Sequence, residues 1–235
     1  KYKELKTPFY YEYIDGWAAL LQNISTFILV LALVIGFLVS GIFSDEFQTK
    51  ADSIFFSARF GRSRGIFAKV GAGFYITTGF YLMFVFLYTF IVLFVLGADG
   101  ASCPIQLDLW RSVYNITFLQ AYLFIVLGGY IGTIFAATLA MLASAFTHST
   151  PTAVIVPFIV LCVFPFLSRI ITLPGLCSFF PDQLLEIYLD IKEAGLITLG
   201  SKVTTIATVI VPVYAVVCLI FQPILYRVYQ KVEIK

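Results

Sequence analysis

The chain has 235 residues, of which 60% are hydrophobic and 12% are charged, and its mean hydropathy is +0.97. Soluble domains are typically about 45–50% apolar and about 25% charged, and their interiors are too small to hide this much apolar surface. The net charge is +2, and the absence of a basic run excludes a nucleic-acid partner. These values predict an integral membrane protein whose partner is the lipid bilayer.

Five stretches are long and apolar enough to cross a bilayer as helices, since a crossing needs about 20 apolar residues. None of the five contains an acidic residue. Strands of a membrane barrel are shorter and alternate polar with apolar positions, a pattern that this sequence lacks. The predicted fold is therefore all-α and polytopic, with a transmembrane domain over 24–226. The expected spans are 24–43, 70–96, 118–146, 154–173 and 203–226.

Basic residues predict which connections face the cytoplasm, where Lys and Arg collect. The 44–69 connection contains five of them and the 227–235 tail contains three, so both are expected inside. Five crossings then make 1–23 an external or interfacial segment. An external start without a visible signal favours an earlier transmembrane helix before Lys1.

The first connection, 44–69, is predicted to contain a new amphipathic helix parallel to the membrane. Ser44 is a good helix N-cap, and the acidic Asp45 and Glu46 suit the positive end of a helix dipole. Gly61 is expected to end this helix. Two interpretations remain open, a solvated loop that obeys the positive-inside rule or a docking element for a cytoplasmic partner. The apolar positions at helical spacing are Phe47, Ala51, Ile54, Phe55 and Ala58.

The order of residues in this connection forms a motif. It reads Phe43-Ser44-Asp45-Glu46, then Ser57-Ala58-Arg59-Phe60-Gly61-Arg62-Ser63-Arg64, and then Lys69 before the next span. This order resembles the cytoplasmic loop in the permease subunits of type-2 ABC exporters. Those loops often have Gly-Thr where this chain has Lys50-Ala51. The long external segment before the last span is also similar to that family.

The resemblance implies a six-helix permease, of which this chain contains helices two to six. It further implies that the chain is not an enzyme and binds no cofactor, metal ion or nucleotide, and the sequence contains no Gly-x-x-x-x-Gly-Lys-Ser/Thr loop. An ABC ATPase subunit holding ATP and Mg²⁺ is the expected partner, together with a second permease copy or a related permease. The expected location is the cell membrane, most naturally the cytoplasmic membrane of a bacterium. The residues implied in coupling are Asp45, Glu46, Phe55, Arg59, Gly61, Arg62 and Lys69.

Small residues recur at every fourth position of the 118–146 span and predict one smooth stripe along the helix. Small side chains let membrane helices approach closely where lipid provides no hydrophobic drive. The stripe is interpreted either as packing within the chain or as a subunit interface that moves during function. Its members are Gly128, Gly132, Ala136, Ala140 and Ser144.

The 154–173 span contains Pro157 and Pro165, which remove backbone donors and predict kinks. Such kinks are either static bends or hinges for transport. Arg169, near the outer end of the span, is expected to extend to the interface, with a substrate or gating role as the alternative.

The external 174–202 segment is too long for a simple turn. Pro181 is suited to the first position of a helix, and Gly195 is expected to end that helix. It is interpreted as an amphipathic helix on the outer surface or as a re-entrant hairpin packed between helices, and either could cap a pathway. The apolar face consists of Leu184, Leu185, Tyr188 and Ile191.

The remaining chemistry-bearing residues are few. His148 is the only histidine and is expected to be a loop residue. Cys162 and Cys218 are expected to behave as small apolar side chains. Cys103 and Cys177 both fall in predicted external loops, where an oxidising environment would allow a disulfide.

The function favoured by the motif and the predicted topology is ATP-driven export by a permease subunit. Two alternatives stay open, a membrane anchor or assembly subunit without transport, and an ATP-independent channel or carrier. Spans without acidic residues disfavour an ion-coupled mechanism. Aromatic, weakly polar spans favour a hydrophobic or amphipathic cargo such as a peptide or lipid.

Overall fold

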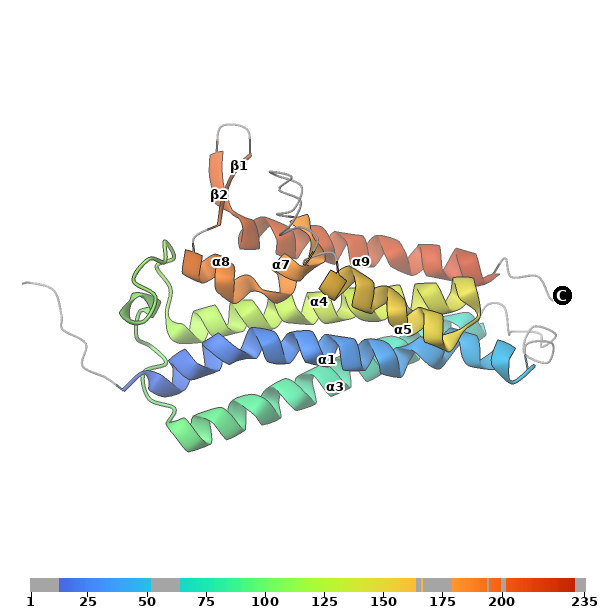
Figure 1. Ribbon diagram of the computed structural model, residues 1–235, viewed down its shortest axis with the longest axis horizontal. Helices are drawn as coiled ribbons and strands as arrows, with labels where there is room; N and C mark the ends of the chain where they lie inside the picture. The colour runs from blue at the N-terminus through green and yellow to red at the C-terminus, as the bar shows by residue number, and fades with distance from the viewer. Residues whose placement is uncertain are drawn as a thin grey trace, which may run out of the picture.

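The computed structural model describes residues 13–51, 64–163, 166, 179–193, 195–199 and 202–230. Within these ranges, four helices are long and apolar enough to cross a membrane. Figure 1 shows them side by side along the long axis of the molecule. The predicted all-α, polytopic membrane fold is therefore confirmed. The four helices are α1 (Asp15–Gln48), α3 (Ile66–Leu96), α4 (Phe118–Thr147) and α9 (Ile206–Gln230).

The bundle has two distinct ends (Figure 1). The start of α1 lies at one end, beside the connection between α3 and α4, and Trp17 Nε1 donates to the carbonyl oxygen of Ala98 at 2.9 Å. We call this the hairpin end, because strands Leu196–Leu199 and Lys202–Thr205 project from that half of the bundle (Figure 1). The last residues of α1 and α9 and the first of α3 lie at the other end, which we call the junction end. The described parts of the two segments predicted to be cytoplasmic, 44–69 and 227–235, thus belong to helix ends that lie at the same end of the bundle (Figure 1).

The core lies between α1 and α4. Ile24, Ile28 and Ile35 of α1 are fully buried, and they recur at the spacing of one helical face. Gly129 of α4 lies so close to Ile28 that an added Cβ would be 2.7 Å from Cγ2 of that side chain. The glycine is needed here because it lets the two backbones approach closely.

α3, by contrast, is mostly exposed on the outside of the bundle. Phe86, Phe90 and Phe94 form a stacked row along it, and each of the three is exposed. Such a row is typical of a lipid-facing surface. Tyr81 faces the other way and is fully buried, with its hydroxyl donating to the carbonyl oxygen of Val126 at 2.7 Å.

The predicted helix start at Ser44 is wrong. α1 does not end before this residue but continues to Gln48, so Ser44, Asp45 and Glu46 belong to the end of a long helix. The chain leaves the helix at Lys50, where φ is 56°. The hydroxyl of Ser44 lies 2.6 Å from Thr150 Oγ1, and this tertiary contact overrides the local preference for a cap.

The span predicted at 154–173 differs from the others. Its described part is α5 (Thr150–Phe158) followed by a π-helical stretch, Ile159–Val163. Pro157 cannot donate the hydrogen bond that would continue the α-helical ladder, which accounts for the change of helix type just after it. Pro165, Arg169 and most of the rest of this span lie outside the described residues, so the crossing here stays a prediction.

Two short helices, α7 (Pro181–Leu185) and α8 (Ile187–Glu193), lie beside α4 and α9 in the half of the bundle toward the hairpin end (Figure 1). Their apolar face is buried, with Leu184, Leu185 and Ile191 at or near zero exposure. Of the two interpretations of the 174–202 segment, the structure shows packing between helices and not a surface helix. A helix on the outer surface would not bury these side chains against α4 and α9.

A β-hairpin that the sequence pattern did not predict follows α8. Strands β1 (Leu196–Leu199) and β2 (Lys202–Thr205) pair antiparallel, with Leu196 opposite Thr205. Figure 1 shows the hairpin projecting from the bundle. It connects α8 to α9 and so fixes where α9 begins.

Candidate functional site

Lys69 joins the start of α3 to the end of α1 at the junction end. Its Nζ atom lies 2.8 Å from Glu46 Oε1 and donates to the carbonyl oxygen of Ile42 at 2.8 Å. The same ammonium lies 5.4 Å from the centroid of the Phe43 ring. The Ile42 carbonyl belongs to the last two turns of α1, and a carbonyl oxygen has a second lone pair that can accept from outside the helix. The same ammonium neutralises an adjacent acid. Lys69 is therefore a cross-link between two long helices.

Thr150 makes a second cross-link, from the first residue of α5 to α1. Its hydroxyl lies 2.6 Å from Ser44 Oγ, accepts from Gln48 Nε2 at 3.0 Å and donates to Asp45 Oδ1 at 3.4 Å. The ring of His148, in the turn just before α5, lies 3.9 Å from the Phe47 ring centroid to centroid. We call the residues of these two cross-links, Glu46, Lys69, Ser44, Asp45 and Thr150, the junction.

Some of the predicted coupling residues lie within the described ranges and others lie outside them. Asp45, Glu46 and Lys69 all belong to the junction. Phe55, Arg59, Gly61 and Arg62 lie outside the described residues, as does Cys177. Their coupling roles, and the disulfide between Cys177 and the buried Cys103, stay predictions. His148 lies in a turn between helices, with a left-handed backbone, as expected for a loop residue.

The small-residue stripe of α4 faces other parts of the same chain. A Cβ added to Gly132 would be 2.6 Å from Cδ2 of Leu185 in α7, and one added to Gly128 would overlap Cδ1 of Ile187 in α8. The glycines therefore form the surface on which the two short helices rest. The other members, Ala136, Ala140 and Ser144, are also fully buried.

Two buried carboxylates accompany α7 and α8 at the hairpin end, Asp182 and Asp190. Burial, and after it the negative charges of Asp182, Glu186 and Glu193, raise the pKa of Asp190 to about 6. A carboxyl group with this pKa changes its charge near neutral pH.

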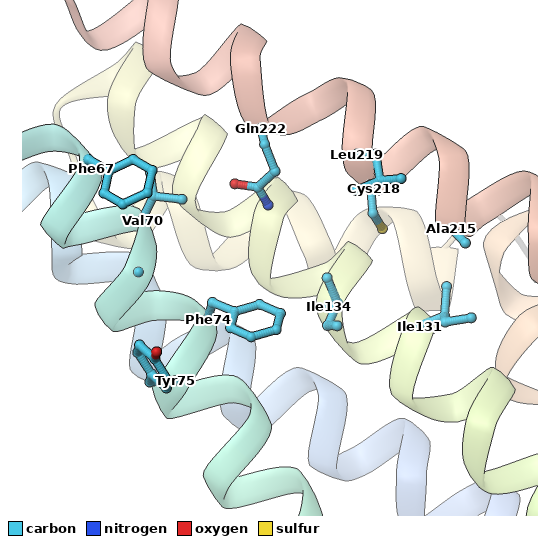
Figure 2. A pocket seen from close by; sticks show the side chains of 11 residues that line it. Phe67, Val70, Phe74, Tyr75, Ile131, Ile134, Ala215, Cys218, Leu219 and Gln222 are labelled. Carbon is cyan, nitrogen blue, oxygen red and sulfur yellow. The ribbon is translucent and has the colours of Figure 1, made fainter.

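A groove between α3 and α9, with α4 as its floor, was not found by sequence reasoning (Figure 2). Its volume is about 540 Å³ and its walls are mainly apolar. Gln222 of α9 points into it, as Figure 2 shows, and its Oε1 is buried without a hydrogen-bond partner among the described residues. Apolar pockets with a few polar groups are the usual form of a binding site.

The described residues contain no group of three or more His, Cys, Asp or Glu side chains that could hold a metal ion. Comparison of the chain with protein-family models, with curated proteins and with solved structures finds no match. The junction, the packed pair α7–α8 and the groove are therefore the observations from which a function can be argued for this α-helical membrane protein.

Proposed function

We propose that the chain is the membrane-spanning permease subunit of an ATP-driven ABC exporter. The observation that supports this most is the junction, where Lys69 and Thr150 tie α3 and α5 to the end of α1. The stretch 52–63, which carries most of the motif, lies between the end of α1 and the start of α3. A force on this stretch would therefore reach three helices at the same time.

In this proposal a separate ABC ATPase subunit binds ATP and Mg²⁺ and docks on the 44–69 connection at the cytoplasmic face. Closure of the ATPase on ATP pushes the junction, and the cross-linked helices tilt together. The tilt changes the packing of α7 and α8 on Gly128 and Gly132, in the half of the bundle away from the junction end. Two permease copies, or this chain and a related permease, enclose the pathway.

The cargo that fits the proposal is a hydrophobic or amphipathic molecule, such as a peptide or a lipid. The four long helices offer mainly apolar and aromatic side chains, and charged groups inside a membrane are the usual mark of an ion pathway. The proposed location is the cytoplasmic membrane of a bacterium, with the junction end inside.

The proposal is tested by purifying the chain from its native membrane together with associated proteins. We expect an ATP-hydrolysing subunit to copurify, and we expect the double variant Arg59→Ala/Arg62→Ala to lose it. Arg111→Ala is the matched control, because Arg111 lies in the connection at the hairpin end, against the Trp110 ring. The Arg111→Ala variant also loses a positive charge, but it should keep the ATPase bound.

Retention of the ATPase by the double variant would contradict the coupling role of the motif. If no ATPase copurifies and vesicles containing the chain alone show flux without ATP, the chain is a channel or carrier. If neither an ATPase nor any flux is found, a membrane anchor or assembly subunit is the correct function.

A further inference from the structure

The groove between α3 and α9 opens on the outer surface of the bundle. Its rim residues Phe67, Tyr75 and Leu219 are 76%, 77% and 72% exposed, so they face the space that lipid fills in a membrane. The floor is formed by Ile131 and Ile134 of α4, as Figure 2 shows. A flexible apolar chain lying in this groove would contact three helices at once.

The groove continues toward the junction end as a second cavity of about 450 Å³, which shares Phe67 and Gln222 with the first. Arg227 lines this second part, and no acidic side chain lines either part among the described residues. The groove thus changes along its length from apolar to cationic. The cation lies near the end of α9, where the headgroups of a bilayer leaflet lie.

Gln222 lies between the apolar part and the cation. It lies five positions before Arg227, which is about 7.5 Å along a helix. Rotation about the last side-chain bond exchanges the oxygen and the nitrogen of a carboxamide. The Gln222 side chain can therefore place an N–H donor where its Oε1 is now buried. A buried amide without a partner is costly, and a ligand that supplies an acceptor at this depth would remove that cost.

We propose that this groove binds one anionic phospholipid from the leaflet at the junction end. The phosphate pairs with Arg227, an ester carbonyl accepts a hydrogen bond from Gln222, and one acyl chain lies over the floor of α4. The order of phosphate, ester and acyl chain in a phospholipid matches the order of cation, amide and apolar wall along the groove. The inference holds whether or not the chain is a transporter.

Two glycines of α3 provide a matched pair of variants. Gly71 lines the groove, Gly79 lies two turns further along the same helix and outside the groove lining, and an added Cβ would meet nothing within 4 Å at either position. Gly71→Leu therefore fills the groove, whereas Gly79→Leu adds the same side chain elsewhere. Both changes have the same intrinsic effect on the helix, so a difference between them reports on the groove.

The experiment measures the melting temperature of the delipidated chain in detergent while phosphatidylglycerol or phosphatidylcholine is added, and counts bound lipid by native mass spectrometry. We expect phosphatidylglycerol to raise the melting temperature by several degrees more than phosphatidylcholine, with one tightly held lipid per chain. Gly71→Leu should lose this difference and the bound lipid, and Gly79→Leu should keep both. Arg227→Gln should bind the two lipids equally.

Equal responses of Gly71→Leu and Gly79→Leu would overturn the proposal, as would equal stabilisation of the unmodified chain by the two lipids. If Gly71→Leu does not fold, Ala215→Leu fills the groove from α9 and the same outcomes apply. Cross-linking of a Gly71→Cys variant in native membranes to another polypeptide would assign the groove to a protein helix and would also overturn it.

Discussion

Glu46 at the junction end and Asp190 at the hairpin end are both acidic side chains on packed helices, but their surroundings differ. Lys69 Nζ lies 2.8 Å from Glu46, whereas Asp190 is 7% exposed and its Oδ2 has no hydrogen-bond partner within the described ranges. A buried carboxyl group without a nearby cation favours its neutral form, and the pKa of Asp190 is raised to about 6. The salt bridge at the junction therefore ties α1 to α3, whereas the charge of α8 is expected to change near pH 6.

The largest expected effect comes from Gly128→Leu, which would displace α8, and Asp190 with it, from its place on α4. The new side chain would overlap Ile187 and press on Val211, so α8 and α9 cannot both keep their places on α4. We expect a loss of about 3 kcal/mol in the free energy of unfolding, measured by thermal unfolding in detergent. Gly79→Leu, with open space around it, is the control, and an equal loss in both variants would show that α8 does not rest on Gly128.

A smaller effect is expected from Lys69→Met, which makes the junction resemble the surroundings of Asp190. Methionine keeps the length of the side chain but removes the ammonium group that contacts Glu46 and the Ile42 carbonyl oxygen. Both partners are mostly buried, so a loss of about 2 kcal/mol is reasonable, again by thermal unfolding. The double variant Glu46→Gln/Lys69→Met should recover part of this loss. No recovery would mean that the pair contributes nothing beyond packing.

The smallest expected effect comes from Asp190→Asn, which removes the titrating group at the hairpin end. The pKa of Asp190 is raised to about 6 in the folded chain, so folding binds a proton and the stability of the unmodified chain falls as pH rises through about 6. At pH 8 the variant should be more stable by about 1 kcal/mol, because its neutral amide buries no negative charge. Unfolding curves from pH 5 to pH 8 that match in the two proteins would contradict the unpaired state of Asp190.

The long helices were accessible from sequence because the length of an apolar run determines whether it can cross a bilayer. The ends of α1 were not, since Ser44 has the local chemistry of a cap but finds its partner in Thr150, far along the chain. Local preference cannot report a contact of that kind. The same limit applies to the groove, whose floor and walls come from three separate helices.

The helical spacing of Leu184, Leu185 and Ile191 predicts one apolar face, and the three side chains are indeed buried together. Spacing alone, however, does not say what covers that face. Lipid and the small-residue surface of α4 accept the same side chains. The structure resolves this choice in favour of α4. The stripe of α4 could have indicated the answer, because a smooth surface of this length requires something to fill it.

The two short helices between α5 and α9 affect how the protein must be assembled in the cell. α7 and α8 carry Asp182 and Asp190 and the polar backbone ends of short helices, which a hydrocarbon environment does not tolerate. They cannot enter the bilayer as an independent hydrophobic unit in the way that α1, α3, α4 and α9 can. Their insertion must wait until α4 and α9 are in place, so the pair would be the last part of the polypeptide to mature and the first exposed to quality-control proteases when assembly fails.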